Sequence, residues 1–132
     1  MKRLFPTLLL SLACTGCSGP DSDLPPAYRR LEVPQALLRS PEARARGKAL
    51  FGANCVLCHG LRGDGHGPRA LGFAKPPANF TDPYWRKRAT PRHVFFTIRE
   101  GVHGTPMPRW DWLDEGETWD LVAYVLGLGA ES

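Results

Sequence analysis

Two cysteines and a histidine stand within five consecutive residues of the chain, in the run Cys55-Val56-Leu57-Cys58-His59. The thiols are three positions apart, and the histidine directly follows the second one. This order is typical of the attachment site of a c-type haem, where both thiols add to the vinyl groups of one porphyrin and the imidazole lies beneath the iron. A chain with this motif has to fold around a large, flat macrocycle.

Three other interpretations of the paired cysteines compete with this one. A structural zinc site needs a second pair of ligands, and no further C-x-x-C or H-x(3–5)-H pair follows in the sequence. A thioredoxin-like redox pair belongs in a βαβ context, whereas Cys55 ends a helical pattern and precedes a glycine-rich stretch. The third interpretation is a chance occurrence, so the motif needs support from other parts of the chain.

Residues 1–17 have the pattern of an export signal. Lys2 and Arg3 form a basic start, and the apolar stretch from Leu4 to Ala13 is too short to span a bilayer. We therefore expect the mature protein outside the cytoplasm, in the periplasm or tethered to the outer side of a membrane.

The end of this signal, from Leu12 to Cys17, resembles the lipobox of bacterial lipoproteins, because a small residue precedes each of its two cysteines. A lipid on Cys17 or on Cys14 would tether the protein to a membrane. Glycine before Cys17 and the signal length favour Cys17, and a signal that is simply cleaved is the alternative. The two cysteines are not a second haem site, because Ser18 stands where a histidine is required.

The net charge of the chain is small. It has 17 Lys and Arg against 13 Asp and Glu, a net charge of +4, and loss of Lys2 and Arg3 with the signal leaves 15 basic side chains and a net charge of +2. Domains that bind nucleic acid carry strong, clustered positive charge. We therefore expect no nucleic acid among the partners. Basic residues between Arg86 and Arg92, and acidic ones between Asp111 and Asp120, are interpreted as solvated faces.

The remaining chain divides into a linker and one domain. Residues 18–39 contain four prolines among polar residues, which predicts an extended tether rather than packed structure. Residues 40–132 fit a single small domain. Their long Gly- and Pro-rich middle shows little strand patterning and would be unusual in a compact domain unless something as large as a haem filled it.

Local signals predict three helices in this domain. Ser40 is a helix N-cap before Pro41, and the helix extends to Asn54. A second helix is predicted at Pro91 to Glu100 after the N-cap Thr90. A third begins after Asp114, which forms a capping box with Glu117, and ends near Gly127.

Gly47 lies on the apolar face of the first of these helices, with Ala43, Leu50 and Phe51. A glycine inside a helix costs roughly 1 kcal/mol relative to alanine, so its presence indicates that another backbone passes close by. The partner that we expect is the last helix. The two helices at the ends of the domain would then cross at Gly47.

A haem iron bound by His59 has a second axial position. Apart from Met1, the only methionine is Met107, which lies between two prolines that stiffen its loop. We expect the Met107 thioether to be this ligand rather than a filler of a core gap. Three histidines are alternative ligands, and His103, four residues before Met107, is the strongest of them; the other two are His66 and His93.

The order of these features resembles that of a monohaem class I cytochrome c, over about Ser40 to Gly129. The resemblance implies an all-α fold in which the N- and C-terminal helices cross and short helices and loops surround one covalently bound haem. It rests on the helix with Gly47 and Phe51, the run Cys55-x-x-Cys58-His59-Gly60, the Met107 loop, and a last helix with Trp119 and Tyr124. Residues 63–68, 76–80 and 98–101 resemble a bacterial subtype of periplasmic or membrane-tethered cytochromes and haem subunits of respiratory complexes.

The resemblance implies roles for individual residues. Cys55 and Cys58 would form the thioether bonds, with His59 as the proximal ligand and Met107 as the distal ligand. Pro68 matches the family's proline whose carbonyl accepts a hydrogen bond from the ligand imidazole. Candidate partners of the haem propionates are Asn79, Trp85 and Arg92.

From these observations we expect one-electron transfer between a donor and an acceptor protein, with no substrate at the iron and no enzymatic activity of the chain itself. The first alternative is a haem enzyme or gas sensor whose sixth ligand is labile, although no constellation of acid and base side chains supports it. The second is a haem subunit within a larger complex, with Trp110 and Trp112 as anchors for a partner or as packing beside the haem.

Overall fold

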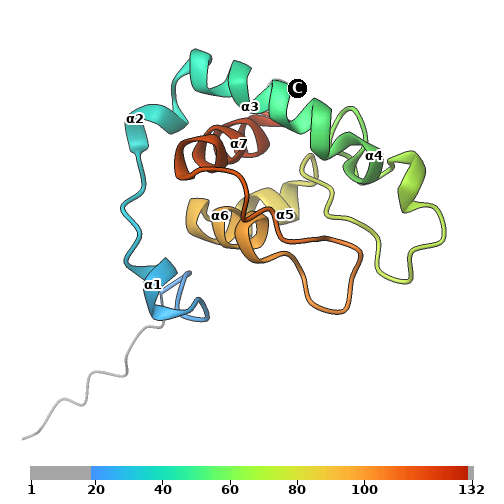
Figure 1. Cartoon of the computed structure of the whole chain (residues 1–132), viewed down its shortest axis with the longest axis horizontal. Coiled ribbons are helices and arrows are strands. Elements are labelled where there is room, and N and C mark those ends of the chain that lie inside the picture. Colours follow the sequence, from blue (N-terminus) through green and yellow to red (C-terminus); the bar gives the residue numbers. More distant parts are fainter. Residues whose placement is uncertain (1–18, 131–132) are drawn as a thin grey trace, which may run out of the picture.

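The computed structural model describes residues 19–130, and the expectations for the export signal and for Cys14 and Cys17 lie outside this range. Within it the fold is all-helical, without a β-strand, and long loops extend on one side of the packed helices (Figure 1). None of the helices between residues 19 and 130 is long and apolar enough to cross a membrane. The helices are α1 (Pro26–Arg29), α2 (Gln35–Leu38), α3 (Pro41–Asn54), α4 (Val56–His59), the 3₁₀ helix η1 (Pro68–Ala70), α5 (Pro83–Arg88), α6 (Pro91–Glu100) and α7 (Glu115–Gly127).

The three helices predicted from local signals are α3, α6 and α7, and their caps are confirmed. The Ser40 hydroxyl accepts a hydrogen bond from the Ala43 amide at 3.2 Å. The Thr90 hydroxyl accepts one from the amide three residues later at 3.1 Å. Asp114 and Glu117 form the reciprocal capping box at the start of α7. Each cap satisfies amides that the first turn of a helix leaves unpaired.

Helices α3 and α7 cross at Gly47, as the sequence predicts (Figure 1). A Cβ atom on Gly47 would lie 2.0 Å from the carbonyl oxygen of Asp120 and 2.9 Å from the Cβ of Tyr124. Only glycine allows the two helices to approach this closely. The crossing therefore depends on the absence of a side chain at this position.

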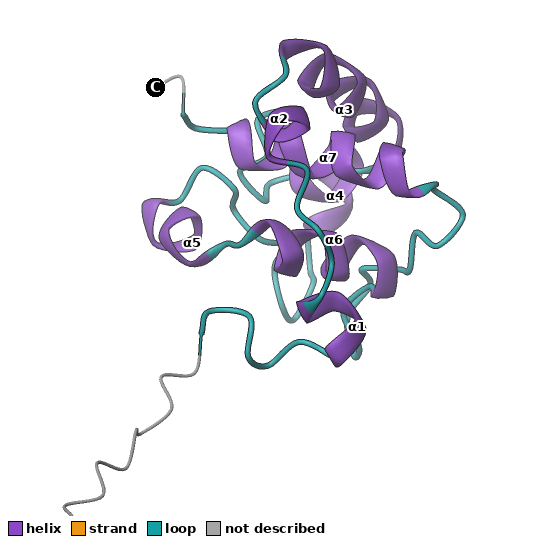
Figure 2. Cartoon of the chain, turned by 90° about the vertical axis from the view of Figure 1, so that its left-hand side faces the viewer, coloured by secondary structure: helices purple, strands orange, loops and turns teal. Residues whose placement is uncertain are grey.

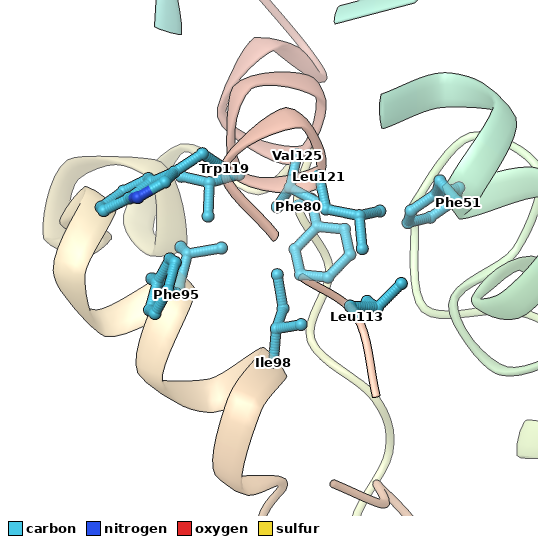
Figure 3. Packing of buried hydrophobic residues seen from close by; sticks show 10 residues of the cluster. Phe51, Phe80, Phe95, Ile98, Leu113, Trp119, Leu121 and Val125 are labelled. Carbon is cyan, nitrogen blue, oxygen red and sulfur yellow. The ribbon is translucent and has the colours of Figure 1, made fainter. Parts of the chain in front are cut away.

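A buried core extends from this crossing to α6. Figure 3 shows Phe95 of α6 and Trp119 of α7 together on one side of this core and Phe51 of α3 on the other, with Ile98 of α6 between them. The ring centroids of Phe95 and Trp119 are 4.4 Å apart. Burial of such side chains stabilises a fold by about 1.5–3 kcal/mol each. The core fixes α6 against α7 on one side of the loops that line the haem site.

An ion pair joins α3 and α7 next to the crossing. Nε and one terminal nitrogen of Arg46 donate to the two carboxylate oxygens of Asp120 at 2.6 and 2.8 Å. The Asp120 side chain is only 7 % exposed, whereas that of Arg46 is 58 % exposed. Asp120 therefore depends on this arginine for its hydrogen bonds.

Replacing Arg46 by alanine is expected to lower the free energy of unfolding by about 1–2 kcal/mol, since it leaves a buried carboxylate without its donor while solvent screens part of the loss. Denaturant unfolding of the holoprotein measures the change. Arg62→Ala is the matched control, because Arg62 pairs with Asp64 from a side chain that is 86 % exposed. Equal losses for the two variants would contradict the prediction.

The sequence predicts an unpacked tether over residues 18–39. This expectation is wrong for residues 19–39, which the structure describes and which we call the strap. Figure 2 shows the strap, with α1 and α2, running across α6 to reach the start of α3. Leu24 is buried, Tyr28 packs on Phe96 with ring centroids 4.8 Å apart, and Arg92 donates to the Leu31 carbonyl at 2.9 Å. The prolines of the strap start and separate short helices that α6 and α7 hold in place.

Tyr28 also donates a hydrogen bond to the carboxylate of Glu100 at the end of α6. Burial, and next this bond to Glu100, raise the pKa of Tyr28 to about 12. The phenol therefore keeps its proton and remains a donor throughout the physiological pH range. This contact joins the strap to the end of α6 from which the Met107 loop departs.

Candidate haem-binding site

A cavity of about 320 Å³ lies between α3, α4, α6 and the loops that connect them. Its walls are mainly apolar and include all four residues that the sequence assigns to haem attachment and ligation: Cys55, Cys58, His59 and Met107. The apolar walls exclude water and lower the local dielectric constant. The other side chains that matter below for this cavity are Phe51, Ala78, Phe80, Trp85, His93 and Trp110.

The short helix α4 places the two thiols and the histidine on one turn. Cys55 and Cys58 are both free thiols on the cavity wall. Burial, together with the nearby Cys58, raises the pKa of the Cys55 thiol to about 12. Their spacing along one helical turn presents both sulfur atoms to the same ligand.

Gly67 folds the glycine-rich chain after α4 back onto the end of that helix. Its amide donates to the Cys58 carbonyl at 3.1 Å. A Cβ atom here would lie 2.4 Å from the carbonyl oxygen of Leu57, so a side chain would separate the loop from α4. The glycine-rich stretch thus fixes the end of α4.

His59 is held by a hydrogen bond and by a ring stack. Its Nδ1 lies 3.3 Å from the Ala78 carbonyl oxygen, and its ring stacks on Phe80 with centroids 4.6 Å apart and planes inclined by 20°. Burial lowers the pKa of His59, while the bond to Ala78 acts in the opposite direction. A neutral imidazole that donates from Nδ1 keeps the Nε2 lone pair for a metal.

The assignment of this carbonyl to Pro68 is wrong. Pro68 is exposed in the 3₁₀ helix η1 and does not line the cavity, whereas Ala78 faces the imidazole. Ala78 follows two prolines, and the Phe80 amide donates to the Gly63 carbonyl at 2.7 Å, which brings this extended segment against α4. The only sequence signal for Ala78 is its place in the stretch 76–80, for which the resemblance implies no role of Ala78 itself.

Met107 lies in a loop that returns to the end of α6. The Val102 amide donates to the Met107 carbonyl at 3.2 Å, and the Met107 amide donates to the Thr105 hydroxyl at the same distance. Prolines on both sides restrict the backbone further. The loop therefore presents Met107 to the cavity from a constrained backbone.

The three alternative histidine ligands occupy different positions. His66 and His103 are exposed and do not line the cavity. His93 does line it, but both of its ring nitrogens face carboxylates of the strap. Its Nδ1 lies 3.1 Å from Asp21 and its Nε2 lies 3.0 Å from Asp23. Each ring nitrogen of His93 therefore has a carboxylate partner in the strap and is not free to bind iron.

Acid is expected to detach the strap from α6. Burial raises the pKa of Asp21, but hydrogen bonds from Thr90, Arg92 and His93 outweigh this effect and lower it overall. The hydrogen bond from His93 also lowers the pKa of Asp23. Both pKa values are lower in the folded protein than in the unfolded chain. The two ionised carboxylates therefore stabilise the docked strap fully well above the ordinary carboxyl pKa, and this stabilisation is lost as the pH falls below about 4.

Hydrogen exchange of the amides in residues 19–33, compared with those of α7, measures this detachment between pH 6 and pH 3. Asp21→Asn is the control, since its strap should exchange rapidly already at pH 6. Strap protection that is unchanged down to pH 3, with α7 still protected, would contradict the prediction.

Trp110, which lines the cavity, carries an unpaired donor. The indole Nε1 of Trp110 is buried and has no hydrogen-bond acceptor among the described residues. A haem propionate is an acceptor of the required kind, and buried donors rarely stay unpaired. Two thiols, an imidazole and a thioether on apolar walls fit a c-type haem.

The three propionate partners suggested by the resemblance lie at different sites. Trp85 lines the cavity, whereas Asn79 and Arg92 do not. The side-chain Oδ1 of Asn79 accepts from the amide and the hydroxyl of Thr81 at 2.9 and 2.6 Å. Arg92 is bound to the strap. Trp110, which the sequence suggested only as a partner anchor or as packing, is the cavity residue with an unpaired donor.

Comparisons with known proteins agree with this site. The family model for cytochrome c matches residues 44–129. The chain is 37 % identical over 89 residues to subunit CcoP of the cbb3-type cytochrome c oxidase of Cereibacter sphaeroides, covering 64 % of this chain and 27 % of the relative. It is 31 % identical over 84 residues to a cytochrome c-553-like protein of Synechocystis sp., covering 63 % of this chain and 67 % of the relative.

A solved structure shares the fold. It is a chain of the reducing HAO-like protein complex of Kuenenia stuttgartiensis, with a TM-score of 0.61 and 29 % sequence identity over 74 % of this chain and 49 % of that one. The present chain thus spans about a quarter of CcoP and half of the solved chain. A match over most of the domain, with the attachment motif on the wall of the cavity, identifies the chain as a member of the cytochrome c family whose cofactor is a covalently attached haem c.

Proposed function

We propose that this protein transfers single electrons between redox proteins outside the cytoplasm, with His59 and Met107 as the two axial ligands of its haem. When bound, the haem supplies a one-electron ferrous–ferric couple. The observation that carries the proposal is that the imidazole and the thioether line the same apolar cavity as the two thiols. With both axial positions filled, no substrate reaches the iron.

Different residues of the chain would have different roles in holding the haem. Cys55 and Cys58 attach the ring, and the Ala78 carbonyl and the Phe80 ring orient the His59 imidazole. The constrained loop around Met107 holds the thioether in place in both oxidation states. A fixed environment keeps the reorganisation that accompanies electron transfer small.

Optical and magnetic spectra of the purified holoprotein test the proposal. Low-spin c-type bands in the reduced state, and in the oxidised state the weak charge-transfer band that reports iron–sulfur ligation, are expected. Tight binding of carbon monoxide to the reduced native protein would instead favour a gas sensor or enzyme with a labile sixth ligand. Absence of low-spin bands would rule out electron transfer by a six-coordinate haem.

A free electron carrier and a subunit of a respiratory complex are the two forms that this function can take. CcoP is by name an oxidase subunit, and the solved relative is part of a complex. These relatives, with the export signal and lipobox expected from the sequence, support a periplasmic role that includes a membrane-tethered subunit. Size-exclusion chromatography of the native protein from gently solubilised membranes distinguishes the two, because a free carrier elutes alone.

A further inference from the structure

The two tryptophans on either side of Asp111 lie in different surroundings. Trp110 lines the cavity, whereas Trp112 does not line it and is 61 % exposed. Their ring centroids are 5.9 Å apart, with planes inclined by 59°. The pair therefore forms an aromatic connection from the cavity wall to the surface.

Three acidic residues lie within three positions of Trp112 in the sequence. Asp111, Asp114 and Glu115 are all exposed. The cations near them include Arg109, whose guanidinium lies 3.7 Å from Asp111 and 3.4 Å from Glu100, and Arg99, whose guanidinium donates to the Leu113 carbonyl. We call Trp112 with these three carboxylates the tryptophan patch.

Among residues 19–130, the other strongly exposed aromatic side chain is Tyr84 on α5, and it has the opposite surroundings. Arg88 donates to its hydroxyl at 2.6 Å and lies over its ring at 5.3 Å, and the last turn of α5 is entirely basic. Tyr84 is therefore a suitable control residue. Its side chain is about as exposed as that of Trp112, but its neighbours are basic and it does not line the cavity.

Exposed tryptophan is well suited to protein contacts, because its large ring buries apolar area at a small entropic cost and is enriched where binding energy concentrates. Carboxylates around it attract and orient a partner of opposite charge. Electron tunnelling also weakens steeply with distance, so a partner seated on Trp112 would benefit from the ring pair that leads to the cavity.

We propose that the tryptophan patch is the docking site for a redox protein with a basic contact face, and that Trp112 and Trp110 lie on the electron route between that partner and the haem. The inference rests on the proposed electron transfer. One electron leaves the ferrous iron and reduces the oxidised centre of the partner; no bond forms or breaks, and no proton moves. The direction reverses when the partner is the donor.

Stopped-flow oxidation of the reduced holoprotein tests this route with two reagents of opposite charge. Tris(1,10-phenanthroline)cobalt(III) is a cationic aromatic oxidant, and ferricyanide is an anionic one. Trp112→Ala is expected to slow the reaction with the cobalt complex about tenfold at low ionic strength, with little effect on ferricyanide. Tyr84→Ala is the matched control and should leave both rates unchanged, while Trp112→Phe keeps an aromatic ring and should retain most of the rate.

A basic cytochrome c of the mitochondrial type serves as the protein probe. At low ionic strength it is expected to shift the NMR resonance of the Trp112 indole N–H, and the double variant Asp111→Asn/Glu115→Gln should weaken this effect. Equal cobalt rates for Trp112→Ala and the wild type, or shifts centred on α5, would overturn the inference while leaving the proposed function intact. If neither reagent oxidises the reduced wild type, the proposed function itself fails.

Discussion

Replacing Met107 by alanine is expected to lower the reduction potential of the haem by on the order of 100 mV and to let the reduced protein bind carbon monoxide. A thioether ligand stabilises ferrous iron relative to ferric iron, and its removal leaves the sixth position to water or another weak ligand. No second methionine is available, because Met107 is the only one besides Met1. Potentiometric titration and the loss of the iron–sulfur charge-transfer band measure the change.

His103→Ala is the matched control for this variant. His103 lies four residues before Met107, is exposed, and is absent from the cavity wall, so its removal should leave the potential and the band unchanged. If the charge-transfer band survives in Met107→Ala and the potential falls only in His103→Ala, the ligand assignment is wrong.

A methyl group at Gly47 is expected to lower the free energy of unfolding by about 3 kcal/mol, and valine should lower it further. The added Cβ would lie 2.0 Å from a backbone oxygen and 2.6 Å from the backbone carbon of Asp120, and neither atom can rotate away. The two helices would have to separate at their closest point. Denaturant unfolding of the holoprotein, monitored by haem absorbance, measures the loss.

Gly52→Ala is the control for the helical preference of alanine. Gly52 lies in the same helix, α3, and a Cβ there would meet no atom within 4 Å. This variant is expected to gain about 0.5–1 kcal/mol, because alanine favours the helix over glycine. Equal stability of the two alanine variants would show that the crossing tolerates a side chain at Gly47.

The sequence predicted the helices whose signals are local. Helices α3, α6 and α7 begin at caps that a few neighbouring residues define, and those caps form as predicted. The packing of the strap could not be predicted in this way. Its contacts join residues about 60 to 70 positions apart, such as Tyr28 with Glu100 and Arg92 with Leu31, and no local pattern encodes them.

The same difference between local and long-range signals applies to the haem site. The motif alone gives the position of the thiols and of His59, because the porphyrin sets their spacing. The carbonyl that accepts from the imidazole depends on the path of the chain between residues 60 and 80. The resemblance assigned it to Pro68, whereas the structure places Ala78 there. The unpaired indole of Trp110 is likewise a property of the assembled cavity.

The crossing of α3 and α7 also restricts how this domain can fold. The two helices at the ends of the domain hold each other, so the stretch between them must be closed into one long loop before either gains its main contacts. Closing such a loop is entropically costly, and folds dominated by distant contacts form slowly. Before α7 packs against α3, Cys55 and Cys58 lie in a loop that is not yet closed. The haem site, whose wall includes Leu121 and Val125 of α7, is therefore complete only after this loop has closed.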